Sequence, residues 1–273
     1  MNQKLVKKKF SDIEKSYDVF LLDLYGVTHN GIKLFPGVLE VLKKLKLSNK
    51  IVVFISNAPR RSMEIKKVLK NFGVDESLYN QVISSGDVVY EYFLKRNDHQ
   101  KCYYIGTEKD KKIFQGLKLI ENDNLNNSNF ILNTGAYENE KVSDYEETLR
   151  KAKSISIKMI CANPDLEVIR GKRREICAGS LAQRYEELGG KVKYFGKPYK
   201  EIYEKSLKLL KIKKNNKILA LGDSLRTDIA GANNFGIDSA LVLSGINKNI
   251  KEIENFCKKT NIYPEFLLNN LKW

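Results

Sequence analysis

The stretch VFLLDLYGVTHNG, residues 19–31, places an aspartate directly after four consecutive apolar residues. A short run without polar residues is typical of a strand that is buried on both faces. Asp23 therefore follows the strand and begins a turn through Tyr25 and Gly26. Ligands of parallel sheets bind beyond the carboxyl ends of the strands, which makes Asp23 a candidate reactive group.

The same rhythm continues on either side of this stretch. Apolar runs predict further strands at 50–55, 217–221 and 239–243, and helical spacing predicts helices at 36–47, 63–72, 201–210 and 228–235. Alternation of helices with continuously apolar strands indicates an α/β fold with a Rossmann-like parallel sheet that helices cover on both faces.

The middle of the chain behaves as a second unit. It contains strand candidates at 101–105, 129–132 and 158–161 and helix candidates at 87–95 and 144–154. We therefore expect an α/β domain at 80–178, inserted into a core domain formed by 1–79 and 179–273.

The net charge of +15 comes mainly from lysines that are scattered over amphipathic segments. This pattern is typical of a solvated surface, and no basic stripe interleaved with aromatic residues predicts a specific nucleic-acid partner. The positive charge favours small anionic ligands.

The cysteine pattern and the hydropathy of the chain predict the cellular compartment of the protein. The four cysteines form no C-x-x-C pair, the N-terminal segment lacks an apolar signal region, and no apolar run reaches the length of a membrane span. We expect a cytoplasmic protein with no membrane partner. The sequence does not fix the oligomeric state, and a homodimer is compatible with it.

Four polar groups fall at the carboxyl ends of predicted strands of one sheet. They are Asp23, Ser56, Lys197 and Asp223. Their convergence would support phosphoryl transfer, because a carboxylate can attack phosphorus and carry the phosphoryl group. Such a reaction needs neutralisation of the phosphoryl oxygens, for which Mg²⁺ and a lysine are suited.

Each candidate takes a role in that chemistry. Asp23 would be the nucleophile and a metal ligand, and Asp223 would be the second metal carboxylate, with Asp228 assisting. Lys197 would pair with the phosphate and with Asp23. Backbone and side-chain donors at a predicted helix start would bind the phosphate oxygens, namely Ser56, Asn57 and Ala58.

Four segments in this order resemble the four motifs of the haloacid dehalogenase superfamily. They are DLYGV (23–27), ISNAP (55–59), GKP (196–198) and GDSLRTDIAGA (222–232). The long insert between ISNAP and GKP resembles the class IIA, NagD-like group, whose members carry an α/β cap there. The resemblance implies a Mg²⁺-dependent phosphatase or phosphotransferase that acts on a small phosphate-bearing substrate, and it does not identify that substrate.

The chain departs from the family at Tyr25. The phosphatases of the family have an aspartate there, which protonates the leaving group and later activates water. Such acid–base help is worth roughly 10²–10⁴-fold in rate. A phenol with a pKa near 10 is a poor base at neutral pH. The resemblance also implies that the backbone carbonyl at this position ligates the metal, a role that Tyr25 can keep.

The tyrosine at position 25 leaves three interpretations of the function open. The leading one is a Mg²⁺-dependent phosphatase, slowed by Tyr25. A phosphate-binding protein with vestigial catalysis is the second. A 2-haloacid dehalogenase is the third, because dehalogenases of the superfamily resemble DLYG here. They lack the metal, however, and insert their cap before the second motif.

Further residues are candidates for substrate contacts. Arg60 or Arg61 could reach an anionic substrate, and the basic run 170–174 could contact a second charged group. Asn163 and Asp165 could line the substrate pocket. Two weaker candidates are His29 as a substitute base and Cys177, which we expect to be packed rather than nucleophilic.

Overall fold

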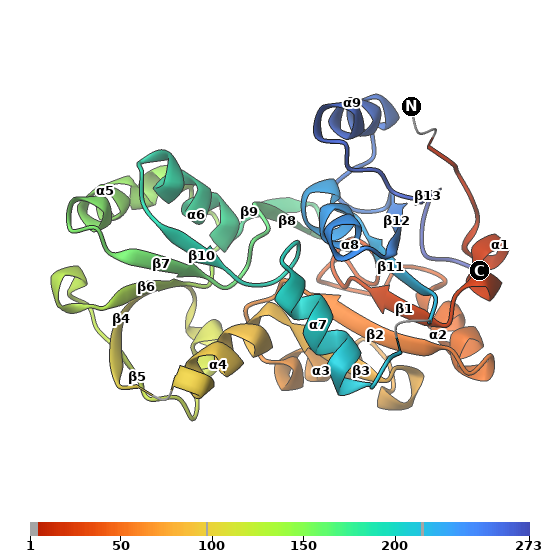
Figure 1. The fold of residues 1–273 in the computed structure, drawn as a ribbon, viewed down its shortest axis with the longest axis horizontal. Helices are drawn as coiled ribbons and strands as arrows, with labels where there is room; N and C mark the ends of the chain where they lie inside the picture. The colour runs from red at the N-terminus through yellow and green to blue at the C-terminus, as the bar shows by residue number, and fades with distance from the viewer. Residues whose placement is uncertain (1–4, 97, 214–215) are drawn as a thin grey trace.

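The computed structural model describes residues 5–96, 98–213 and 216–273, so residues 1–4 and 214–215 of the predicted core domain and residue 97 of the predicted insert lie outside it. Figure 1 shows two bodies side by side, each built around a sheet, with a two-stranded hairpin between them. The predicted α/β fold with parallel sheets is confirmed.

The first sheet has six parallel strands in the order β13-β12-β11-β1-β2-β3. The chain leaves β1 toward one edge and later returns to its other side with β11, so the strand order reverses between these two neighbours. This is the point where open α/β sheets bind ligands. The strands are β1 (Val19–Leu22), β2 (Ile51–Ser56), β3 (Gln81–Ser84), β11 (Ile218–Gly222), β12 (Asp238–Val242) and β13 (Phe266–Leu268).

Helices bury both faces of this sheet, which explains the unbroken apolar run of β1. Phe20 and Leu22 face α2 (Val38–Leu47) and α3 (Ser62–Asn71). Val19 and Leu21 belong to the opposite layer, with α7 (Lys200–Leu209) and α8 (Ala230–Phe235). Two further helices are α1 (Phe10–Ile13), which packs in the first layer, and α9 (Ile250–Thr260), which packs against β12 and β13.

The second sheet has five parallel strands in the order β10-β7-β6-β4-β5. One face is covered by α5 (Glu146–Ser154) and α6 (Ala178–Glu187). The other is covered by α4 (Ser85–Arg96), whose Phe93 stacks on Phe130 at 5.1 Å between ring centroids. The strands are β4 (Gln100–Ile105), β5 (Leu119–Glu121), β6 (Phe130–Asn133), β7 (Lys158–Cys161) and β10 (Val192–Tyr194).

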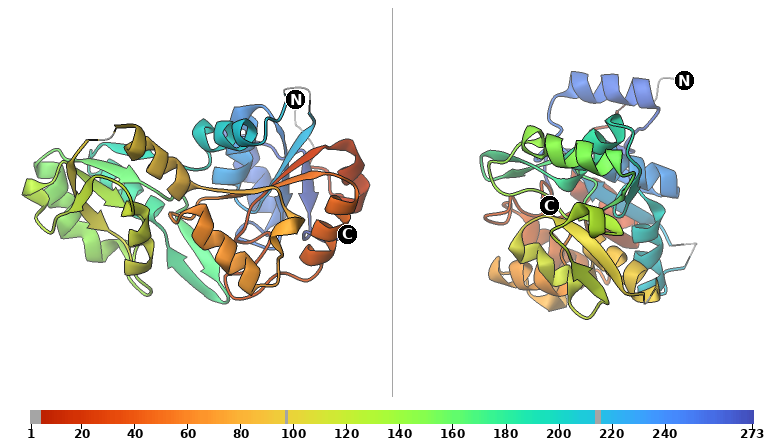
Figure 2. Two further views of the ribbon diagram at one scale, coloured as in Figure 1. Left: turned by 90° about the horizontal axis from the view of Figure 1, so that it is seen from below. Right: turned by 90° about the vertical axis from the view of Figure 1, so that its left-hand side faces the viewer.

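A hairpin of β8 (Glu167–Arg170) and β9 (Arg173–Ile176) joins the two bodies, and the left view of Figure 2 shows it reaching from the second body toward the first. The backbone N–H of Gly171, at its tip, donates to the carbonyl of Asn30 at 2.9 Å. The hairpin therefore reaches from the second body to the loop that follows β1.

The strand pairing moves the expected domain boundaries. β3 lies within the predicted insert but pairs with β2 in the first sheet. β10 lies after the predicted insert but pairs with β7 in the second sheet. We therefore propose that the inserted domain runs from the region between Ser84 and Gln100 to just after Tyr194, in place of 80–178.

Two properties of the described chain bear on its surroundings. None of its helices combines the length and the apolarity that crossing a bilayer requires. The four cysteines are free thiols in buried positions.

Candidate active site

A cavity of about 290 Å³ lies where the carboxyl ends of the two sheets face each other. The first sheet contributes the turns after β1, β2 and β11, with Asp23, Ser56 and Asp223. The second contributes the turns after β4 and β7, with Lys109 and Asn163. The β8–β9 hairpin forms a further wall. Ligands of parallel sheets bind beyond the carboxyl ends of the strands, and both sheets place these ends at the one cavity.

Three carboxylates and one ammonium group form the centre of the core side. Asp23, Asp223 and Asp228 each offer an oxygen within 4.8 Å of the others, and all three are buried. The Nζ of Lys197 lies 2.5 Å from Oδ1 of Asp23 and 2.6 Å from Oδ1 of Asp228. One cation therefore faces three acids in a poorly solvated place.

Burial and the excess of negative charge raise the pKa values of two of these acids. Burial raises the pKa of Asp23 to about 7; the charge of Lys197 opposes the shift, and that of Asp228 adds to it. Burial and the charge of Asp23 raise the pKa of Asp223 well above its usual value. Buried carboxylates that share a site resist ionising together unless more positive charge is present.

The backbone after β11 aims two of these acids. The register pairs Leu22 with Leu221, which brings Asp23 beside the end of β11. A π-helical turn, Leu225–Ile229, follows, and Oδ2 of Asp228 accepts from the N–H of Ser224 at 3.1 Å. Single π-helical turns recur at functional sites, since the extra residue re-aims side chains.

Two glycines leave room for Asp223. A Cβ on Gly26 would lie 2.0 Å from Oδ2 of Asp223, and one on Gly245 would lie 1.7 Å from it. Gly26 also has a φ of +80°, which glycine adopts without strain. The same oxygen accepts from the N–H of Ile246 at 2.7 Å.

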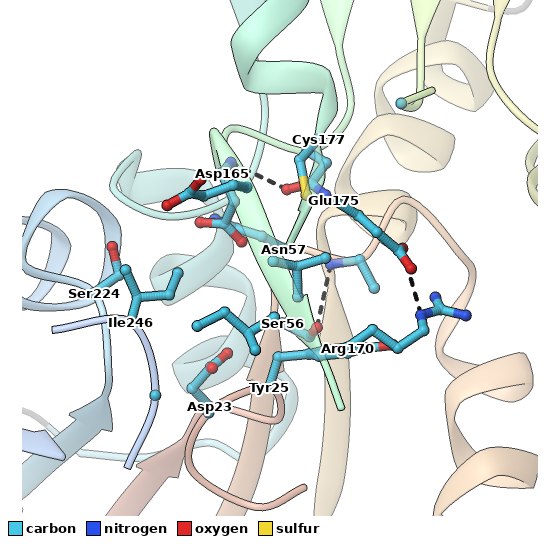
Figure 3. A pocket seen from close by; sticks show the side chains of 18 of the residues that line it. Asp23, Tyr25, Ser56, Asn57, Asp165, Arg170, Glu175, Cys177, Ser224 and Ile246 are labelled. Atoms are coloured by element: carbon cyan, nitrogen blue, oxygen red, sulfur yellow. Dashed lines mark hydrogen bonds and ion pairs between the residues drawn. The ribbon is translucent and has the colours of Figure 1, made fainter. Parts of the chain in front are cut away.

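Asn57 ties three distant segments together. Its Oδ1 accepts from the N–H of Lys197 at 2.7 Å, and its Nδ2 donates to the Lys197 carbonyl at 3.0 Å. The same Nδ2 lies 3.0 Å from Oδ1 of Asp165. Beside it, Oγ of Ser56 accepts from the N–H of Ala58 at 3.2 Å, a contact drawn in Figure 3. This network fixes Lys197 and orients the turn after β2.

The Tyr25 side chain extends away from Asp23 toward Arg170 (Figure 3). Its ring contacts His29 edge to face, with 4.6 Å between centroids. His29 is buried, its Nδ1 accepts from the N–H of Gly31, and burial together with Arg170 lowers its pKa to about 4. His29 does not line the cavity, so the geometry does not favour it as a substitute base.

The candidate basic residues divide by position. Arg60 lines the cavity and pairs with Asp110 at 2.6 Å, whereas Arg61 pairs with Asp87 at 3.0 Å outside it. Of the run 170–174, Arg170 and Gly171 line the cavity. Arg173 and Arg174 are exposed and pair with Glu138 and Glu167. Cys177 is packed at the cavity wall, where burial raises the pKa of its thiol.

The principal site residues expected from the sequence line this one cavity, whereas Arg61, His29 and residues 172–174 do not. The catalytic roles of these principal residues remain predictions. They are Asp23, Tyr25, Ser56, Asn57, Ala58, Arg60, Asn163, Asp165, Lys197, Asp223 and Asp228. The sequence reading missed the segment 244–246 beside Asp223, although it follows the predicted strand 239–243. It also missed Lys109, which lies in the short 3-10 helix Glu108–Phe114 of the second body, and Glu175, which lies in β9 of the hairpin.

Comparison with known families identifies both halves of the first body. A model described as haloacid dehalogenase-like hydrolase matches residues 20–119, and one for HAD-like hydrolases matches residues 194–272. The two matches flank the segment that carries most of the second sheet.

Individual proteins match nearly the whole chain. A 4-nitrophenylphosphatase of Schizosaccharomyces pombe is 24% identical and covers 97% of this chain and 95% of its own. The ribonucleotide monophosphatase NagD of Escherichia coli is 24% identical, with 89% of this chain and 94% of its own covered. The crystal structure of a haloacid dehalogenase-like hydrolase from Brucella suis is 29% identical, with a TM-score of 0.86, and covers 97% of this chain and 100% of that one.

Proposed function

Because the chain belongs to the haloacid dehalogenase superfamily of hydrolases, in its class IIA, NagD-like group, we propose that it is a Mg²⁺-dependent phosphatase of a small phosphate monoester. The observation that carries the proposal is the meeting of Asp23, Asp223, Asp228 and Lys197 at one end of the cavity. The relatives named as phosphatases support the substrate class.

The acid cluster fits a hard divalent cation. Its donors are all oxygens, which Mg²⁺ prefers, and Asp223 has no ion pair within the described residues. Asp23 and Asp223 would hold the ion, with the Tyr25 carbonyl as a third ligand and Asp228 assisting. When bound, Mg²⁺ would neutralise carboxylate charge and the charge of the phosphoryl oxygens.

The remaining groups would bind the phosphoryl oxygens. Lys197 contributes a buried ammonium group, and the turn Ser56-Asn57-Ala58 contributes a hydroxyl and backbone N–H groups. Asn57 already fixes the Lys197 backbone, which would hold the ammonium group against the nucleophile. Preorganised donors of this kind stabilise the charge that develops in the transition state.

Proton transfer requires a group other than Tyr25, whose hydroxyl points away from Asp23. Asp165 is the suitable carboxyl group. The other carboxyls of the cavity form ion pairs or belong to the acid cluster, whereas Asp165 forms no ion pair within the described residues and accepts from Asn57. Burial raises the pKa of Asp165, which favours the protonated form that a general acid needs.

The proposed cycle has two steps. A carboxylate oxygen of Asp23 attacks phosphorus, the bond to the ester oxygen breaks, and the leaving oxygen takes a proton from Asp165 to become an alcohol. Water then attacks the aspartyl phosphate and gives its proton to Asp165. The bond between phosphorus and Asp23 breaks, inorganic phosphate leaves, and both carboxyl groups return to their starting forms.

A substrate panel tests the function. The purified protein with Mg²⁺ would be offered 4-nitrophenyl phosphate, alkyl and sugar phosphates, and 2-chloropropionate. We expect phosphate release that stops in Asp23→Asn and in excess chelator. Chloride release that is insensitive to chelator would instead identify a dehalogenase. Binding of Mg²⁺ and phosphate without turnover would identify a vestigial site.

A further inference from the structure

The far end of the cavity, away from the acid cluster, gathers three cationic side chains. Arg60 comes from the turn after β2, Lys109 from the turn after β4 and Arg170 from the end of β8. Two acids lie near these cations, Asp110 and Glu175, which leaves one positive charge in excess among the five groups. Figure 3 shows Arg170 directed away from Asp23, with Glu175 reaching toward it from β9.

The two arginines use only part of their guanidinium groups. Arg60 pairs with Asp110 through Nε at 2.6 Å. Arg170 faces Glu175 through Nε at 3.4 Å, and that Nε has no hydrogen-bond partner in the described part of the chain. Within the described residues, no hydrogen bond engages the terminal nitrogens of either guanidinium group. These nitrogens are the donors that bind planar anions in pairs.

Lys109 is the least compensated of the three cations. It forms no ion pair within the described chain, and its side chain is exposed at the cavity. Desolvation and then the charges of Arg60 and Arg170 lower its pKa, so the three cations are near enough to repel one another. An anion placed among them would relieve that repulsion.

We propose that Arg60, Lys109 and Arg170 form a second anion subsite, and that the substrate is a phosphate monoester with another anionic group at its far end. The proposal rests on the phosphatase function argued above. A carboxylate or a second phosphate would satisfy the same donors, because both accept paired hydrogen bonds from guanidinium groups.

Matched substrates test the subsite. ω-Phosphooxy carboxylates of two to six carbons and α,ω-alkanediol bisphosphates would each be compared with the alkyl phosphate of equal length. We expect at least one anionic series to exceed its neutral partners in kcat/KM by about tenfold or more, mainly through KM. A pairwise preference of this size corresponds to about 1.4 kcal/mol. Which series wins distinguishes a carboxylate from a phosphate.

Lys109→Met is the informative variant, because it leaves no carboxylate unpaired. We expect it to reduce the anionic preference ratio about tenfold. Lys111→Met, in the same segment as Lys109, and Arg173→Met, in the hairpin beside Arg170, are the controls: each neutralises a cation that lies outside the cavity. They should keep the wild-type ratio. An equal loss in all three variants would reveal a general charge effect and overturn the subsite.

The outcome is separable from the proposed function. If the protein hydrolyses alkyl phosphates in an Asp23-dependent reaction but does not prefer anionic substrates, the subsite proposal is wrong and the phosphatase proposal still holds. If nothing is hydrolysed, calorimetric titration of Asp23→Asn decides the question. Butane-1,4-diyl bisphosphate should bind about tenfold more tightly than butyl phosphate, and less so after Lys109→Met. Equal binding of both would contradict the proposal.

Discussion

The Nζ of Lys197 lies 2.5 Å from Oδ1 of Asp23, although 174 residues separate the two along the chain. The same nitrogen bridges to Asp228, and the side chain of Lys197 is 3% exposed. The contact joins the end of β1 to the segment that returns from the second body. It therefore carries both a charge balance and a connection between distant parts of the fold.

Loss of the lysine charge should destabilise the protein. Lys197→Met leaves buried carboxylates without their cation, and breaking a buried ion pair from one side costs roughly 3–5 kcal/mol. Urea unfolding in metal-free buffer measures the change. Lys200→Met is the control, since its side chain is 73% exposed and pairs with Glu204 within one helix. Equal stability of the two variants would contradict this account of Lys197.

Mg²⁺ should stabilise the wild-type protein against heat. A ligand that binds only the folded state adds about 2.7 kcal/mol at a hundred times its Kd. Asp223→Asn should abolish the increase in Tm, because it removes a proposed ligand and the carboxylate that lacks an ion pair. The exposed Asp123→Asn serves as the control. An undiminished Mg²⁺ effect in Asp223→Asn would place the ion elsewhere.

Asp165→Asn should slow hydrolysis in proportion to the basicity of the leaving group. General acid catalysis contributes about 10²–10⁴-fold when the alkoxide must be protonated, and much less for 4-nitrophenolate. Steady-state rates across a series of alkyl and aryl phosphates give the dependence. A loss of the same size for every leaving group would make Asp165 a structural residue, held by Asn57.

Tyr25→Asp should raise phosphatase turnover. It places a carboxyl group two residues after the nucleophile and removes a phenol that points away from it. Tyr25→Phe is the matched control, and we expect wild-type turnover from it, because no hydrogen bond of the hydroxyl occurs within the described chain. Single-turnover assays separate formation of the phospho-enzyme from its hydrolysis. A slower Tyr25→Asp enzyme would show that the ring has its own role.

Ligands bind beyond the carboxyl ends of parallel strands, and this rule explains which part of the site the sequence could predict. Asp23 and Asp223 each follow an unmistakable apolar run, and neighbouring parallel strands bring such ends together. The pattern could not give their distance, nor the π-helical turn that aims Asp228, because both depend on register and local backbone geometry.

The domain boundaries were harder to predict from the sequence, because they depend on which sheet two short strands join. β3 and β10 are short, and a strand of three or four residues has no partner preference that a single sequence reveals. Each joins the sheet opposite to the one that its place in the chain suggested. Lys109 and Glu175 were missed because they lie in a short 3-10 helix and a four-residue strand, elements too short for hydrophobic periodicity to reveal.

The limited space around Asp223 affects how the results of a mutational screen should be interpreted at the positions that surround it. Gly26 and Gly245 bring no functional group, yet any larger residue at either would overlap the carboxylate oxygen. In a saturation screen for activity, both positions should therefore score as essential as the acids themselves. Their intolerance would report an occupied volume and not a chemical role.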